Sequence, residues 1–416
     1  MDDQIKGAWV IYHTGKLKDV TRASVEYGQI DTAGKCGLLL SSLAASEQTT
    51  ISREKVSALA NAVDITRLEL QTILGELEKQ QLISFSSKEV SVLGVSMAAT
   101  LGHVTTIFNE SNPSVKEQAI IDLSEKTSEL PCDSLWAREY IGDTYKIPDA
   151  EVDDLLIESE SIGFIDFASI DSTKKILFNG NLFRKEDAKK ISCICSSLSE
   201  SDNRKILELN ESLDKQGCIN IALAEKIIGS DLFKKLHSIG IYDVNCVENK
   251  HGSFEFVTKA SAFSKFSETI ADDAFDLAKI FVTSLTYGIT QSSSGRGRIT
   301  MIQKLMQKLV RGDWVGPATA IGEDYKLLEL RRVLEVKPEK GGKMFNMRLL
   351  KKDVGELALR LIVSGDISSE SIQLPGASVN AYSGPEKTRT FQKKSQTPQS
   401  QAEIAKILDT LRTGKI

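Results

Sequence analysis

The stretch LLELRRVLEVKPEKGGKMFNMRLLKK (residues 327–352) contains a pattern of elements that recurs along this chain. A segment with an apolar stripe leads into LEVK (334–337), and KMFNMRL (343–349) follows after a turn. Alternation of apolar and polar residues with a period of two is typical of β-strands, and the Gly341-Gly342 pair suits a reversal. The stretch therefore predicts a helix followed by a β-hairpin with a basic turn.

The same pattern occurs three more times upstream. A helix with Leu70, Ile73, Leu74 and Leu77 on one face precedes the first hairpin. The predicted strand pairs are ISF (83–85) with VSVLGV (90–95), FIDF (164–167) with KILF (175–178), and IYDVNCV (241–247) with SFEFV (253–257). The turn markers Ser87, Ser172, Lys250 and Lys340 are 85, 78 and 90 residues apart, which indicates one small domain per repeat.

Further helical patterns precede each hairpin. In the first copy they cover 37–49 and 52–65, and a third helix begins near Thr66. The predicted order is helix, helix, turn, helix, hairpin. This order resembles the winged-helix variant of helix-turn-helix proteins, in which the third helix is the candidate recognition helix and the hairpin is the wing. The resemblance covers about residues 30–365, rests on pattern alone, and extends to chains with tandem units, such as certain transcription-initiation and RNA-polymerase-associated subunits.

The expected fold class is mainly α with short β-hairpins (α+β), arranged as four tandem degenerate winged-helix domains. Helical linkers such as 114–130 and 273–289 would join them. The expected domains are 1–110 with an N-terminal helix, 111–185 (acidic), 186–270 and 271–365 (basic). The stretch SGPEKTRTFQKKSQTPQSQ (383–401) is polar, contains Pro and Gln and is poor in apolar residues, so residues 366–416 are expected to form a disordered tail. A short C-terminal helix would place Ile404, Ile407, Leu408 and Leu411 on one face, for docking on this chain or on a partner.

Charge is distributed unevenly along the chain. The whole chain has a net charge of −5, but the span 296–360 holds fifteen Lys and Arg against eight Asp and Glu. That excess of seven leaves −12 for the remainder. The third helix of the second unit, EVDDLLIESES (151–161), has five acids and no base. Because binding to nucleic acid begins with the neutralisation of phosphates, the fourth unit is the candidate contact, and the acidic units are candidates for binding other proteins.

The cations of the fourth unit form a candidate phosphate-binding surface. Lys304, Lys308 and Arg311 follow an i, i+4, i+7 spacing and share a helix face, opposite an apolar stripe of Ile302, Leu305 and Leu309. The full predicted set is Arg296, Arg298, Lys304, Lys308, Arg311, Lys337, Lys340, Lys343, Arg348, Lys351 and Lys352. Such contacts position a protein on a duplex without reading its sequence. Two other interpretations stay open: an ordinary solvated face, or a surface for an acidic protein.

Motifs for catalysis are mostly missing. YHTGKL (12–17) lacks the upstream glycine and the Ser or Thr of a phosphate-binding loop, and SGRGR (294–298) lacks the third glycine of a dinucleotide site. Asp149 with Asp187-Ala188-Lys189 is a weak match to the carboxylate and lysine spacing of metal-dependent nucleases, although both stretches look like helix starts. We predict no catalytic residue, no metal site and no cofactor.

Cysteine usage, the length of apolar windows and the N-terminal stretch indicate the cellular compartment of the protein. Six scattered cysteines in a long chain indicate reduced thiols, buried as small apolar groups, and four histidines show no zinc-ligand spacing. No window approaches about 18 uninterrupted apolar residues, so no membrane partner is expected. The N-terminal MDDQIKGAWVIYHTGK does not fit a secretory signal, and we expect a cytoplasmic protein, or a nuclear one in a eukaryote.

These features favour a non-enzymatic protein that binds duplex DNA, or RNA, as a transcriptional regulator or a subunit of a DNA-associated complex. The alternative is a scaffold whose repeats bind only proteins. A nuclease is the least favoured reading.

Overall fold

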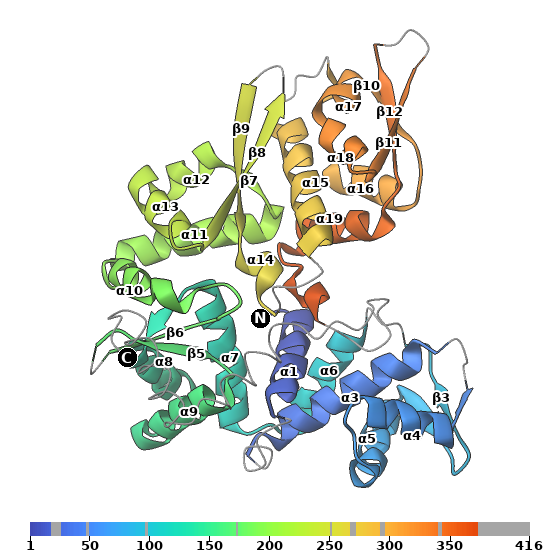
Figure 1. Cartoon of the computed structure of the whole chain (residues 1–416), viewed down its shortest axis with the longest axis vertical. Coiled ribbons are helices and arrows are strands. Elements are labelled where there is room, and N and C mark those ends of the chain that lie inside the picture. The colour runs from blue at the N-terminus through green and yellow to red at the C-terminus, as the bar shows by residue number, and fades with distance from the viewer. Residues whose placement is uncertain are drawn as a thin grey trace, which may run out of the picture. The chain divides into compact units, whose positions relative to one another are not determined.

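The computed structural model describes residues 1–17, 26–46, 50–95, 99–171, 174–249, 252–266, 272–291, 296–339 and 343–372. Within these ranges the chain is mainly helical and forms four small three-stranded antiparallel sheets (Figure 1). The predicted α+β class with short hairpins is confirmed at this level. The expected tail and its C-terminal helix lie outside the described residues, apart from the first few tail positions.

One order of elements recurs four times: helix, strand, helix, helix, strand, strand. We call each occurrence a repeat. The first repeat comprises α3 (Gly28–Ala44), β1 (Thr50–Ser52), α4 (Arg53–Ala62), α5 (Arg67–Lys79), β2 (Ile83–Phe85) and β3 (Glu89–Val92). The second comprises α7 (Val115–Glu129), β4 (Cys132–Asp133), α8 (Ser134–Tyr145), α9 (Asp149–Ile162), β5 (Asp166–Ser169) and β6 (Lys175–Phe178).

The later repeats follow the same order. The third comprises α11 (Glu200–Gln216), β7 (Ile219–Asn220), α12 (Ile221–Ile228), α13 (Ser230–His237), β8 (Tyr242–Asn249) and β9 (Gly252–Lys259). The fourth comprises α16 (Ile302–Val310), β10 (Val315–Ala318), α17 (Thr319–Asp324), α18 (Lys326–Leu330), β11 (Leu334–Pro338) and β12 (Phe345–Leu349). In every sheet the third strand lies between the first and the second.

Other elements precede, separate or follow the repeats. They are α1 (Asp3–Leu17), α6 (Thr100–Glu110), the 3-10 helix η2 (Lys185–Asp187), α10 (Ala188–Ser196), α14 (Ser261–Ser264), α15 (Asp272–Thr290), α19 (Lys352–Ser364) and the 3-10 helix η4 (Ser368–Ser371). The segment 114–130, expected as a linker, forms α7, which is the first helix of the second repeat. Its N-terminus is fixed by a capping box between Ser114 and Glu117.

The first strand of each repeat was not predicted from the sequence. These strands contain only two to four residues. In three repeats the last strand residue also caps the next helix: Ser52, Asp133 and Asn220 accept backbone N–H groups through their side chains. Each short strand pairs with the third strand of its sheet, as in Ile51 opposite Val90. Because the partner strand lies about forty residues away, the residues around the short strand give little local indication that it forms.

The buried apolar side chains of the described residues form three clusters that cross the expected domain boundaries. One runs from Ile5 to Leu177 and also includes Phe266, a second runs from Ala168 to Val257, and a third from Cys218 to Ile367. The last joins Phe256 of the third repeat to the fourth repeat. Neighbouring repeats therefore share cores, so a fragment of residues 290–365 would lose part of its packing.

A buried ionic cluster links segments distant in the sequence. Lys265 is 2% exposed, and its ammonium lies 2.6 Å from Glu125 and 2.7 Å from Asp366. Trp9 donates its indole N–H to Glu125, and Asn179 donates to the Lys265 carbonyl. Burial opposes ionisation of Asp366, but Lys265 holds the pKa of this carboxyl below its usual range. The cluster thus connects α1 and α7 with the segments around α14 and η4.

Candidate nucleic-acid interface

Helix α16 presents cations on one side and buries the other. Lys304 and Lys308 are exposed, whereas Met306 and Leu309 are buried. The predicted stripe residues Ile302 and Leu305 are half-buried, so Met306 completes the core-facing side that the sequence pattern had only partly identified.

Arg311 follows the end of α16. Its guanidinium is exposed and lies 3.3 Å from the Asp313 carboxylate, so part of its charge is neutralised locally. Lys304 also lines a hollow of about 410 Å³ between α11, α15, α16 and α19, together with Lys215 and Thr290. Lys215 in turn lies 3.8 Å from Glu211, so Lys304 is the cation of this hollow without an ion-pair partner.

The β11–β12 hairpin carries a compact ionic cluster. Its strands pair from Leu334 opposite Leu349 to Pro338 opposite Phe345. Glu335 lies 3.1 Å from Lys337 and 2.6 Å from Arg348, and hydrogen bonds from these two cations lower the pKa of the Glu335 carboxyl.

Trp314 lies against the same two cations. Lys337 Nζ is 4.7 Å from the indole centroid, and Arg348 Cζ is 5.1 Å from it. Lys337 and Arg348 therefore already have partners within the hairpin. Lys343 is exposed, while the predicted contact Lys340 and the Gly341-Gly342 turn lie outside the described residues.

Arg296 differs from the other predicted contacts. It donates hydrogen bonds of 2.8 Å to Glu323 and to Asp324, and its side chain is only 18% exposed. Burial alone would lower the pKa of the guanidinium, but bonds to Tyr287 and the two carboxylates raise it instead. Arg296 thus ties α17 to α15. Arg298 is exposed and donates to the Ile289 carbonyl at 2.8 Å.

The two lysines at the start of α19 are both exposed. Lys352 pairs with Glu356 at 3.4 Å on the same helix. Among the described residues of the fourth repeat and α19, the predicted contacts without an ion-pair partner are Lys304, Lys308, Lys343 and Lys351. These four are the cations most available to an external anion.

The third helix of the fourth repeat is predicted from the sequence ahead of the hairpin, but none of its residues was included in the candidate site. Helix α18 buries Leu328 but exposes Leu327 by 49% and Leu330 by 80%. The spacing of these two leucines, three residues apart and flanking a buried one, was the available signal. Such a surface suits a protein contact better than a polar base edge.

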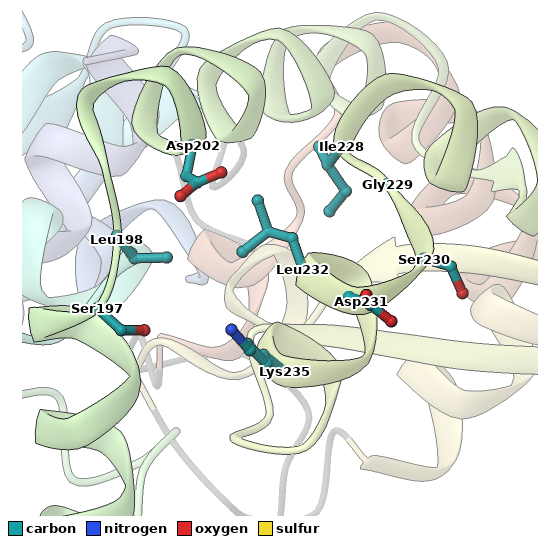
Figure 2. Close-up of a pocket in the computed structure, with 9 residues that line it drawn as sticks. All are labelled: Ser197, Leu198, Asp202, Ile228, Gly229, Ser230, Asp231, Leu232 and Lys235. Atoms are coloured by element: carbon teal, nitrogen blue, oxygen red, sulfur yellow. The ribbon is translucent and has the colours of Figure 1, made fainter.

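A separate cavity of about 360 Å³ lies in the third repeat, between the start of α11 and the α12–α13 turn. Figure 2 shows Leu198 and Leu232 pointing toward one another, with Asp202 and Lys235 on either side. The Asp202 carboxylate accepts from the backbone and the hydroxyl of Ser199 in a capping box. Its role is therefore to cap α11, and the cavity offers no evident reaction chemistry.

The positions of Asp149 and Asp187 in the structure do not support the nuclease hypothesis. Asp149 is the first residue of α9 and pairs with Arg138 at 3.2 Å, while Asp187 lies in η2 ahead of α10. Neither carboxylate lies on a strand. In the part of the chain that the structure describes, no three His, Cys, Asp or Glu side chains gather as a metal would need.

The cysteines are free thiols, as the sequence predicts, but not all are buried. Cys36 and Cys218 are buried, whereas Cys193 and Cys246 are exposed.

None of the helices in the described ranges has both the length and the apolar character needed to cross a bilayer. Neither a protein-family model nor a curated protein sequence matches the chain.

Proposed function

We propose that this chain is a non-enzymatic nucleic-acid-binding protein of four tandem winged-helix domains that docks on a duplex backbone through its fourth domain. Four observed repeats of helix, strand, helix, helix and hairpin, each with the third strand central, support the winged-helix assignment. In this scheme α5, α9, α13 and α18 take the place of the third helix, and the hairpins take the place of the wings.

The exposed cation face of α16 carries the proposal. Lys304 and Lys308 lie one turn apart on a helix whose opposite side is buried, so their ammonium groups are held on one side of a fixed scaffold. Lys343 on the wing and Lys351 before α19 would add further phosphate contacts. Point charges of this kind neutralise phosphates and release counterions irrespective of base sequence.

Binding would therefore be largely independent of base sequence. The outward side of the third helix of the domain, α18, is occupied by the exposed leucines Leu327 and Leu330, which cannot form hydrogen bonds with base edges. The other three domains, which carry most of the negative charge, would set the geometry and bind proteins, as in a regulator or subunit of a DNA-associated complex in the cytoplasm or nucleus.

A scaffold without nucleic-acid contact is the second candidate. The observation that favours it is the exposed aliphatic side chain on three of the third helices: Leu68 is 90% exposed, Ile157 65% and Leu330 80%. Large exposed aliphatic groups are more typical of protein interfaces than of phosphate-binding surfaces.

Duplex binding by the full chain distinguishes the two functions. We would measure fluorescence anisotropy of a labelled duplex with wild type and with Lys304→Ala/Lys308→Ala/Lys343→Ala. The matched control, Lys185→Ala/Lys189→Ala/Lys205→Ala, removes the same charge from exposed sites elsewhere. The proposal expects the first variant to bind about 10²-fold more weakly at 0.1 M salt and the control to bind nearly as wild type. Equal weakening by both variants, or no binding by wild type, would favour the scaffold.

A further inference from the structure

Helices α9 and α18 occupy the same place in their repeats but present opposite charge. On α9, Val152, Leu155 and Leu156 face the core. The outward side carries Asp149, Asp153, Asp154 and Glu160 around Ile157, which is 65% exposed. Two of these acids, Asp149 and Asp153, each lie 3.2 Å from Arg138 of α8. Glu160 lies 2.6 Å from Lys175, and α9 itself contains no base.

The outward side of α18 has the reverse character. Leu327 and Leu330 are exposed on one side of the helix, whose buried residue is Leu328. Lys326, Arg331 and Arg332 are exposed beside them, and Glu329 is the one acid within the helix. The helix ends where Arg332 adopts a left-handed conformation with φ of 54°, which brings Val333 back to bond with the Leu328 carbonyl.

The basic side continues beyond the helix. Leu350 is 49% exposed, and its backbone N–H bonds to the Val333 carbonyl, directly after the end of α18. The next residue, Lys351, is also exposed. The α18 surface, defined as Lys326, Leu327, Leu330, Arg331, Arg332 and Leu350, thus combines aliphatic groups with a basic rim. The α9 surface, defined as Asp149, Asp153, Asp154, Ile157 and Glu160, combines an aliphatic group with an acidic rim, because Arg138 and Lys175 bring two positive charges against its four carboxylates.

We propose that copies of this chain associate head to tail, with the α9 surface of one copy packed on the α18 surface of the next. Both surfaces are exposed within one chain, so neither covers the other. Their charges are complementary, which favours this pairing and steers the encounter. A pairing of like surfaces would place acids against acids or bases against bases, so each contact joins an α9 surface to an α18 surface. Repeated contacts of this kind generate a two-fold dimer with two reciprocal contacts, a larger ring or an open chain.

The proposal does not depend on nucleic-acid binding, because the α18 surface contains none of the proposed phosphate contacts, Lys304, Lys308, Lys343 and Lys351. If the chain both binds a duplex and associates head to tail, successive copies would each present an α16 face to one duplex. The resulting avidity would exceed that of a single chain.

Sedimentation velocity over a range of concentrations tests the proposal with the full chain. The average mass of wild type is expected to rise with concentration and to fall as salt is added, because salt screens the charged rims. Ile157→Lys and Leu330→Glu each destroy one surface, and both residues are exposed, so both variants should fold with an unchanged circular dichroism spectrum. Alone, each variant is expected to remain monomeric at concentrations where wild type assembles.

The mixture of the two variants gives the decisive result. Ile157→Lys keeps its α18 surface, and Leu330→Glu keeps its α9 surface, so an equimolar mixture should form dimers and nothing larger. Leu207→Glu is the matched control, because Leu207 is 60% exposed on α11, away from both surfaces, and it should assemble as wild type. Wild type that stays monomeric at low salt, assembly that survives in either variant, or a mixture that stays monomeric would each overturn the proposal.

Discussion

Replacing Arg296 by alanine separates cations that stabilise the fourth repeat from cations that face outward. Removing one partner of a buried ion pair costs about 3–5 kcal/mol, because the other charge stays buried. Asp324 has a side chain only 1% exposed, whereas Glu323 is 22% exposed and can recover some water. We therefore expect a loss near the lower end, about 3 kcal/mol, or more than a hundredfold in the local opening equilibrium.

Hydrogen exchange of α15 and α17 measures this loss locally, which suits a chain whose repeats share cores. Arg298→Ala is the control: it removes an exposed arginine with one backbone hydrogen bond and should cost about 0.5–1.5 kcal/mol. Under conditions where the protein stays folded, the salt dependence of duplex binding should not change in Arg296→Ala. A loss below about 1 kcal/mol, combined with a salt slope reduced by about 0.9, would show that Arg296 contacts phosphate and would refute the reasoning.

Three further changes test the described contacts. Lys265→Met leaves Glu125 and Asp366 buried without their cation, and the unfolding free energy from a urea titration should fall by about 3–5 kcal/mol; an unchanged midpoint would mean that the cluster is dispensable. The pKa of Asp366 lies below its ordinary 3.8, so its contribution is present above that pH and is lost as the pH falls through the lower folded value. Wild type and Asp366→Asn should thus differ in stability at neutral pH and converge in strong acid, whereas a constant difference would contradict the assignment. Thr66→Ala removes the side-chain half of a capping box with Glu69 and should destabilise α5 by about 1 kcal/mol, seen as faster hydrogen exchange in that helix but not in α4.

The hairpins were predictable from sequence because their signal is local. Period-two alternation and turn residues placed ISF at 83–85 and KILF at 175–178, which are the bounds of β2 and β6. The third hairpin is longer than predicted, since β8 and β9 extend to their turn at Asn249 and Gly252. The first strands of the repeats escaped prediction because their pairing depends on a distant third strand.

The candidate site was predictable to a similar extent. The i, i+4 spacing of Lys304 and Lys308 placed both on the exposed face of α16. Sequence could not show that Arg296 pairs with carboxylates 27 and 28 positions away, or that Lys337 and Arg348 share Glu335 across the hairpin. Because of these ion pairs, fewer cations of the span 296–360 are free to contact phosphates than its excess of Lys and Arg over Asp and Glu suggests.

The salt dependence of duplex binding by the full chain is the most direct measure of the central claim. Five described cations of the predicted set lack ion-pair partners: Arg298, which donates to the Ile289 carbonyl, and the lysines Lys304, Lys308, Lys343 and Lys351, which are the cations that we expect to contact phosphates. At about 0.9 per phosphate contact, a plot of log K against log salt should have a slope of about −3 to −4, and Lys304→Ala/Lys308→Ala should reduce its magnitude by about 1.8. A slope near zero, or one that the double variant leaves unchanged, would contradict phosphate docking through α16.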